Sequence, residues 1–163
     1  MTELTTNGTV FDECTFTNVK FNVSTHTDSA FTNCTFRGCN FFDATFTRCK
    51  LTGSTFRDCS WDIVKVIGGN WGFVGMPGAK LGGVTFDGVT LREADLTGAQ
   101  CVASSFLSCD LSGASVAKAS FDNADLRGSD ISAFDPATVS LRGAIITEHQ
   151  AVTIATAFGL RVE

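Results

Sequence analysis

The stretch FTNCTFRGCNFFDATFTRCKLTGSTFRDCS, residues 31–60, places a large apolar side chain at every fifth position. A second series holds small residues instead, and each of them comes two residues before a large residue in the sequence, as Cys34 does before Phe36. The large series reads Phe31, Phe36, Phe41, Phe46, Leu51 and Phe56, and the small one reads Cys34, Cys39, Ala44, Cys49, Ser54 and Cys59. A helix requires an apolar period near 3.6 and a flat strand a period of 2, so a period of five fits neither. It predicts a chain that turns a corner every five residues and sends one large and one small side chain inward each time.

The same phase runs in both directions from this stretch, from Phe11 to Ile146, without an insertion. Every fifth position in that range is apolar except His26 and Pro136. Four sides of five residues close a square coil, and coils of this kind stack at the inter-strand distance of about 4.8 Å. The expected fold is therefore an all-β quadrilateral β-helix of about seven coils, in which each coil buries its apolar residues only against its neighbours.

Units such as Cys34-Thr-Phe-Arg-Gly38 and Ala124-Asp-Leu-Arg-Gly128 resemble the pentapeptide-repeat family over roughly residues 9–148. The resemblance implies that the β-helix is right-handed. The segments Leu141-Arg-Gly-Ala144, His149-Gln-Ala-Val152 and Ala157-Phe-Gly-Leu160 are similar to the C-terminal end of the MfpA/Qnr branch of that family. Members of this branch are regarded as homodimeric DNA mimics that bind DNA gyrase or topoisomerase IV and are linked to quinolone resistance.

Two segments depart from the regular repeat. Residues 67–79 are rich in glycine, and we expect a local distortion there, with Trp71 inward, Gly69 making room and Phe73 outward. Around Phe134 and Pro136 the large residue falls on the small position, and proline cannot donate a ladder hydrogen bond, so we expect a bulge.

The five-residue pattern ends at Ile146, which divides the chain into a β-helix, residues 1–146, and a C-terminal segment, residues 147–163. Thr147 and Gln150 form a predicted capping box, which starts a short α-helix that Gly159 ends. A short strand is expected over Leu160 to Val162. The helix is expected either to cover the last coil alone or to make a dimer contact as well. The residues expected at the dimer interface are Ala151, Ile154, Ala155, Phe158 and Leu160.

The residues that could carry chemistry are expected to be structural. All seven cysteines fall on inward positions, so we expect them to be buried thiols that bind no metal. His26 is expected to be a hydrogen-bonded core residue, and His149 a surface or interface residue. The sequence contains no P-loop, GxSxG or HExxH motif. We therefore predict a protein that is not an enzyme and uses no cofactor.

The net charge of −5 argues against direct binding to nucleic acid. The acidic excess lies in the second half, where Glu93, Asp95, Asp110 and Asp130 are expected to form a patch that attracts a basic partner. The leading hypothesis is a DNA mimic that binds gyrase or topoisomerase IV. The alternative is a scaffold for another protein, with an apolar side that carries Phe42, Ile63 and Val102. No membrane span or signal peptide is visible, so the predicted location is the cytoplasm.

Overall fold

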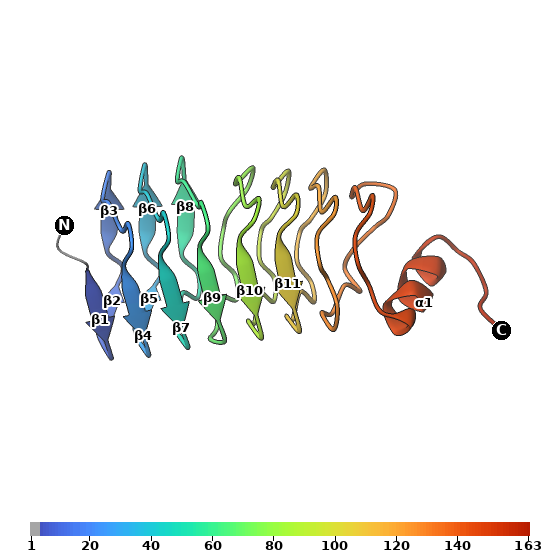
Figure 1. The fold of residues 1–163 in the computed structure, drawn as a ribbon, viewed down its shortest axis with the longest axis horizontal. Helices are drawn as coiled ribbons and strands as arrows, with labels where there is room; N and C mark the ends of the chain where they lie inside the picture. The colour runs from blue at the N-terminus through green and yellow to red at the C-terminus, as the bar shows by residue number, and fades with distance from the viewer. Residues whose placement is uncertain (1–3) are drawn as a thin grey trace.

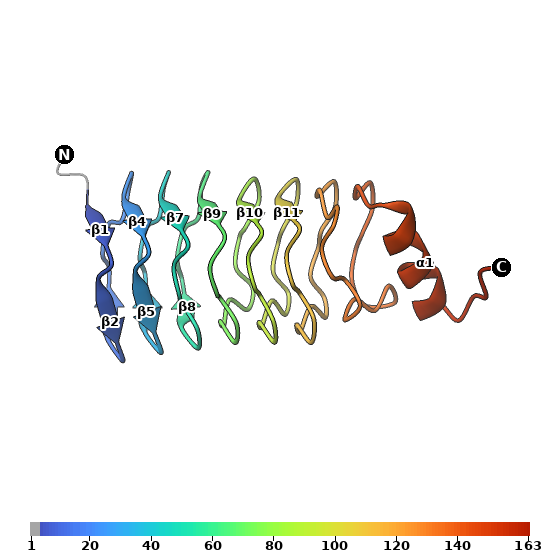
Figure 2. The ribbon, with the colours of Figure 1, turned by 90° about the horizontal axis from the view of Figure 1, so that it is seen from below.

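The computed structural model describes residues 4–163 as a rod of stacked coils that ends in a helix (Figures 1 and 2). Each strand has three residues, because the chain turns a corner after it. The strands are β1 (Thr5–Asn7), β2 (Val10–Asp12), β3 (Thr15–Thr17), β4 (Thr25–Thr27), β5 (Ala30–Thr32), β6 (Thr35–Arg37), β7 (Thr45–Thr47), β8 (Thr55–Arg57), β9 (Lys65–Ile67), β10 (Thr85–Asp87) and β11 (Ser105–Leu107), and the helix is α1 (Glu148–Ala157).

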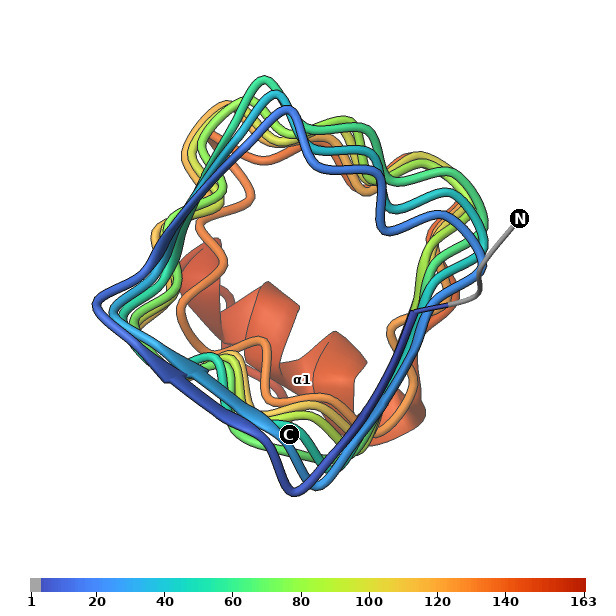
Figure 3. The ribbon, with the colours of Figure 1, turned by 90° about the vertical axis from the view of Figure 1, so that its left-hand side faces the viewer.

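Backbone pairing is parallel, and the paired residues are twenty apart. Thr5 pairs with Thr25, and Thr25 with Thr45. The coil therefore has twenty residues, and we use "column" for a set of residues spaced by twenty that stack along the rod. Seen down the axis, the chain has a four-sided outline and winds clockwise away from the viewer (Figure 3), which makes the β-helix right-handed. This confirms the predicted fold class.

Three sides of the square carry named sheets and the fourth does not. The sheets have the orders β1-β4-β7-β9-β10-β11, β2-β5 and β3-β6-β8. The fourth side is joined by isolated bridges, such as Lys20 with Asn40 and Lys80 with Gln100.

The expectation of about seven coils needs a correction. Regular strand pairing extends over five turns, from β1 to β11. Beyond β11 the same column continues only as isolated bridges, Ser105 with Asp125 and Asp125 with Ile145. The other two sheets change to isolated bridges earlier, after β5 and after β8, so the C-terminal coils stack with the same spacing but without named strands.

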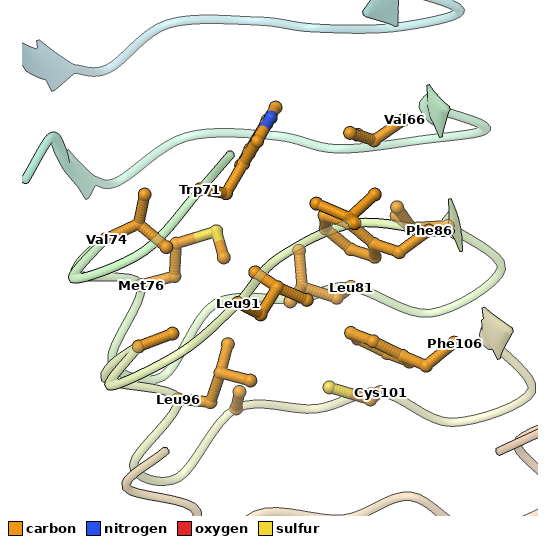
Figure 4. Close-up of a cluster of buried hydrophobic side chains, with 14 of the residues drawn as sticks. Val66, Trp71, Val74, Met76, Leu81, Phe86, Leu91, Leu96, Cys101 and Phe106 are labelled. Atoms are coloured by element: carbon orange, nitrogen blue, oxygen red, sulfur yellow. The ribbon is translucent and has the colours of Figure 1, made fainter. Parts of the chain in front are cut away.

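The interior is filled by side chains that stack along the columns (Figure 4). The ring of Phe36 stacks on those of Phe16 and Phe56, with centroids 4.9 and 4.6 Å apart. Toward the C-terminus the columns change to Leu, Val, Met and Cys, all fully buried between residues 74 and 101. Because the interior is filled, we look for functional residues on the outer surface of the rod.

Each corner needs a residue in the left-handed backbone region, which glycine adopts without strain. Gly53 and Gly83 fill such corners with φ of 71° and 72°. Other corners hold non-glycine residues at the same φ, among them Ile63 at 51° and Phe73 at 59°. The side chains of the corner residues point outward, so they make up much of the surface of the rod.

In the glycine-rich segment the side chains lie as predicted, but the expected distortion is absent within residues 67–79, because Asn70 and Gly75 keep the twenty-residue pairing. Trp71 is fully buried, whereas Phe73 is 61% exposed. A Cβ on Gly69 would collide with the backbone of Cys49, so this position requires glycine. At the second segment, the amide of Lys118 donates to Thr138, twenty residues on, whereas corner amides elsewhere donate to a carbonyl nineteen residues on, as Gly98 does to Ala117. This one-residue shift is the expected bulge.

The C-terminal strand predicted over Leu160 to Val162 is wrong. These residues are exposed and have no strand partner, because α1 lies between them and the last coil. Within residues 4–163, no helix is long and apolar enough to span a membrane.

Candidate functional site

Asp110 and Asp130 are the centre of the predicted acidic patch. They are backbone partners in one column, on the side of the rod that also carries β2, so their carboxylates extend from adjacent coils. Asp110 Oδ1 accepts the amide N–H of Ser112 at 3.0 Å and the Ser112 hydroxyl at 2.5 Å. The Ser112 hydroxyl and amide hold the pKa of Asp110 below its usual value. Asp110 is therefore fully charged at neutral pH.

Glu93 stands at a corner of the same side, with φ of 57°. Its carboxyl group lies over the corner of the next coil, where a Cβ added to Gly113 would come within 2.7 Å of the Glu93 carboxyl carbon. Gly113 therefore makes the room that Glu93 occupies. Gly113 was not predicted as part of the site, and the signal for it in the sequence is a glycine twenty residues after an acidic corner residue.

Asp95 lies around the next corner, on the side of β3, β6 and β8. It pairs with Gly75 and Ser115, is half-buried, and accepts the amide N–H of Thr97 at 3.0 Å. The structure thus brings Asp110 and Asp130 together with Glu93 on one side and places Asp95 beyond an edge. Arg92, next to Glu93, is near enough to contribute to the lowered pKa of Asp110, so one positive charge interrupts the patch.

The C-terminal helix begins with the predicted capping box. The Thr147 hydroxyl accepts the amide of Gln150, and the Gln150 side chain accepts the amide of Thr147. The helix ends at Ala157, Phe158 is its C-cap, and Gly159 follows with φ of 79°. The amides of Gly159 and Leu160 donate to Thr156 and Ala155, which is the hydrogen-bond pattern of a Schellman motif.

Gln150 is the one buried residue of α1, and it covers the end of the solenoid. Its Nε2 donates to the carbonyl oxygens of Leu126 at 2.6 Å and Ser129 at 2.8 Å. One coil earlier, the equivalent carbonyls of Phe106 and Cys109 accept from the Ser129 hydroxyl and the Asp130 amide of the following coil. A single carboxamide therefore makes both hydrogen bonds that a further coil would make.

The five residues predicted at a dimer interface differ in exposure. Ile154 is partly buried and packs against the core, and Ala155 is also partly buried. Ala151 is exposed, and Phe158 and Leu160 are each 61% exposed. The inner face of α1 thus contacts the last coil, while its C-terminal end presents large apolar side chains outward.

His26 is a core residue, as predicted. Its Nδ1 lies 2.8 Å from the Thr6 hydroxyl and its Nε2 lies 2.9 Å from the Ser24 hydroxyl. Its ring stacks on Phe46 with centroids 4.7 Å apart. Burial lowers the pKa of His26 to about 4, so the ring is neutral at physiological pH. His149 is exposed in the first turn of α1.

The cysteines are free thiols, but the expectation that all seven are buried needs a correction. Cys14 and Cys59 are only partly buried. Cys14 belongs to the first coil, on whose outer side the described residues 4–163 place no further coil, and Cys59 lines a surface hollow. Burial raises the pKa of Cys109 to about 11 and that of Cys101 to about 12, so both stay protonated. Residues 4–163 contain no cluster of three potential metal ligands.

Comparison with known proteins identifies the repeat. A model of pentapeptide repeats matches in eight copies, over residues 27–59, 78–100 and 104–133. No curated protein matches the chain significantly. Among solved structures, QnrB1, a plasmid-mediated fluoroquinolone resistance protein, is 15% identical with a TM-score of 0.51, over 93% of this chain and 100% of that one.

HetL, a pentapeptide-repeat protein involved in heterocyst differentiation regulation in the cyanobacterium Nostoc, is 16% identical. Its TM-score is 0.44, over 83% of this chain and 86% of HetL. At these identities the likeness concerns the fold alone. The three segments matched by the family model cover more than half of the 163 residues, and they coincide with the stacked coils of the structure. The chain therefore belongs to the pentapeptide-repeat family.

Proposed function

We propose that this protein is a DNA mimic that binds DNA gyrase or topoisomerase IV and protects the enzyme from quinolones or other gyrase poisons. The observation that carries the proposal is the pair of carboxylates of Asp110 and Asp130 on adjacent coils, with Glu93 on the same side. The low pKa of Asp110 keeps its charge in place at neutral pH. Asp95 extends the negative surface around the corner.

The proposed mechanism is competition for a basic surface. The carboxylates of Asp110 and Asp130 come from strand positions about 4.8 Å apart along the rod. Together with Glu93 they present a cluster of negative charge to the lysines and arginines that would otherwise hold DNA phosphates. The interior of the rod is filled, so the activity rests on surface charge and requires neither a cofactor nor catalysis by this chain. Affinity should fall steeply with salt concentration.

A homodimer through α1 would join the acidic halves of two rods at the centre of a longer one. The exposed side chains of Phe158 and Leu160 supply apolar surface for that contact, together with Ala151, Ile154 and Ala155. The dimer is tested separately by sedimentation equilibrium of the wild type and of Phe158→Asp. A monomeric wild type would exclude the dimer and leave the acidic patch to be tested alone.

The test is DNA supercoiling by gyrase, titrated with this protein in the presence and absence of ciprofloxacin. Inhibition, or rescue from the drug, is expected at micromolar protein and should be lost in the triple variant Glu93→Lys, Asp110→Lys and Asp130→Lys. The matched control, Asp12→Lys, Glu13→Lys and Asp87→Lys, makes the same change in net charge outside the patch. An inactive wild type, or equal loss in both triple variants, would reject the proposal.

A second candidate function is supported by a different surface. Phe42, Ile63 and Val102 are 43%, 51% and 42% exposed on the side without a named sheet, which favours a scaffold that binds another protein there. In the gyrase assay, loss of activity in Phe42→Ser together with full activity of the charge-reversed triple variant would favour this candidate over DNA mimicry.

A further inference from the structure

The fourth side of the rod carries large apolar side chains in neighbouring coils. Val23, Phe42, Ile63 and Val102, which we call the apolar face, are between 38% and 51% exposed. The amide of Val23 donates to the carbonyl of Phe42 at 2.8 Å, and that of Asp43 donates to Asp62 at 2.9 Å. These hydrogen bonds join the three consecutive coils that carry Val23, Phe42 and Ile63. Val102 lies two coils beyond Ile63, and Gly82 and Gly83 occupy the coil between them.

Two of these residues have a backbone conformation that is unfavourable for their side chains and should lower the stability of the fold. Val23 and Ile63 occupy corners with φ of 57° and 51°, where glycine stands in the equivalent corners at Gly83 and Gly143. A β-branched residue is strained in this region, and an exposed one gains little by burial to offset the strain. Among the non-glycine corner residues of 4–163, these two alone are β-branched, and both lie in one column. Strain of this kind on an exposed apolar residue points to a role at the surface.

A hollow of about 500 Å³ opens beside the apolar face. Its walls come from two adjacent coils, residues 56–62 and residues 77–80. The hollow exists because the second of these coils holds small residues. Gly78 and Ala79 stand twenty residues after Asp58 and Cys59, and a Cβ added to Gly78 would meet no atom within 4 Å. The glycine-rich segment thus creates a recess in the surface of the rod.

The charge of this region is negative. Asp58 and Asp62 both line the hollow, and Asp43 lies next to Phe42. None of the three forms an ion pair within residues 4–163. Lys80 is the single basic residue in the lining. A surface that combines exposed apolar side chains with unpaired carboxylates fits a segment that is apolar and basic.

We propose that the apolar face and the adjoining hollow bind a basic amphipathic helix of a protein partner. Its apolar side chains would cover Phe42, Ile63 and Val102, and an arginine or lysine would enter the hollow and pair with Asp58 and Asp62. The five coils from that of Val23 to that of Val102 are separated by four steps of about 4.8 Å, which span about 19 Å. A helix of about 13 residues at 1.5 Å each covers that distance.

This surface is separate from the acidic patch. The apolar face lies on the fourth side, which also holds Lys20 and Asn40. Asp110 and Asp130 lie on the β2 side, ten positions away in the twenty-residue coil, so the two sides face opposite directions. This proposal rests on the second candidate function, which uses the same apolar side, and it succeeds or fails independently of DNA mimicry. One rod thus offers surfaces for two partners at once.

The test uses a synthetic peptide of 14 residues with leucines at helical spacing and arginines flanking them. Binding is followed by backbone amide shifts in NMR spectra of the 17.3 kDa chain, which locate the site without any variant. We expect shifts concentrated at residues 42–43, 58–63 and 78–83. Two control peptides replace every arginine by glutamate or every leucine by serine, and both should bind at least about tenfold more weakly, a difference of 1.4 kcal/mol.

Matched variants test whether peptide binding depends on this site or only on the overall charge and hydrophobicity of the protein. Ile63→Ser and Asp62→Asn should each weaken the arginine–leucine peptide about fivefold to tenfold. Ile67→Ser and Asp87→Asn make the same changes at exposed positions on another side and should leave the affinity unchanged. Equal binding of the glutamate peptide, shifts centred on the acidic patch or on α1, or equal losses in the control variants would overturn the proposal.

Discussion

A single side chain, that of Gln150, completes the backbone hydrogen bonds at the C-terminal end of the rod. Every inner coil satisfies the carbonyls of the coil before it, and the last coil has no successor. The Gln150 carboxamide supplies the two missing donors, to Leu126 and Ser129, and at the same time closes the capping box with Thr147. One residue therefore both starts the helix and ends the solenoid.

The variant Gln150→Glu tests this role, because it keeps the size of the side chain and removes its donors. Two buried carbonyls would lose their partners and face a carboxylate, so we expect the free energy of unfolding to fall by about 2 to 4 kcal/mol. Urea unfolding followed by circular dichroism measures the change. Gln100→Glu, at an exposed position, is the control and should change stability by less than about 0.5 kcal/mol.

His26 makes a second prediction at the scale of the residue. Its pKa is about 4 in the folded protein and 6.5 in the unfolded chain, so between these values the unfolded chain binds a proton that the folded protein does not. Stability is therefore highest above pH 6.5 and is lost as the pH falls toward 4. The loss from this residue should approach about 3 kcal/mol.

Replacing His26 by Phe, the residue that stacks on it from the next coil, should remove this part of the pH dependence. The measurement compares urea unfolding of wild type and variant at pH 7.5 and pH 4.5. His149→Phe is the matched control, since that residue is exposed and should leave the pH dependence of the wild type unchanged. An identical slope in wild type and His26→Phe would show that carboxylates, rather than His26, cause the acid sensitivity.

At the scale of the coil, the glycine-rich segment is held by a complementary pair of core residues. Trp71 makes edge contacts with Phe46 and Phe86, with centroids 5.4 and 5.8 Å apart. These two rings belong to the coils before and after that of Trp71, in the column where the intervening residue is Val66. The small Val66 thus leaves a gap that the indole of Trp71 fills from across the interior (Figure 4).

This complementarity predicts that the effects of substitutions at Val66 and Trp71 on the free energy of unfolding are not additive. Val66→Phe restores the usual large residue of its column but leaves no room for the indole, so it should destabilise the fold by about 1 to 3 kcal/mol. Trp71→Leu alone leaves a cavity and should also destabilise. In the double variant the added ring fills that cavity, so its loss should be smaller than the sum of the single losses by at least about 1 kcal/mol. Additive losses in urea unfolding would contradict the pairing.

The five-residue phase was sufficient to predict the coil because it depends on local chemistry alone: a large and a small inward residue recur at each corner. It also placed Trp71, Phe73 and the bulge near Pro136 correctly. Features that depend on the neighbouring coil were missed. The pairing of Glu93 with Gly113 and the exposure of Cys59 both follow from which residue stands twenty positions away. The strand expected at Leu160 failed for the same reason, since no coil edge is left beside it.

At the scale of the molecule, the two ends of the rod differ. The C-terminal end is covered by α1, with Gln150 and Ile154 against the last coil. The N-terminal end is open among the described residues: an apolar hollow of about 240 Å³ is lined there by Leu4, Phe11, Phe16 and Val19, among others. The first coil also presents a strand edge, whose exposed residues include Val10. An open edge of parallel strands accepts another chain readily.

Removal of residues 147–163 should therefore convert a capped rod into one with two complementary ends. The exposed last coil of one copy can stack on the first coil of another, because both repeat at the same inter-strand distance, and this head-to-tail contact does not close on itself. Sedimentation velocity should show species that grow with concentration, and electron microscopy should show filaments one coil wide. Val10→Lys, which places a charge on the N-terminal strand edge, should suppress the growth without restoring the lid. Truncated protein that stays the size of the full-length chain would show that α1 has no part in limiting assembly.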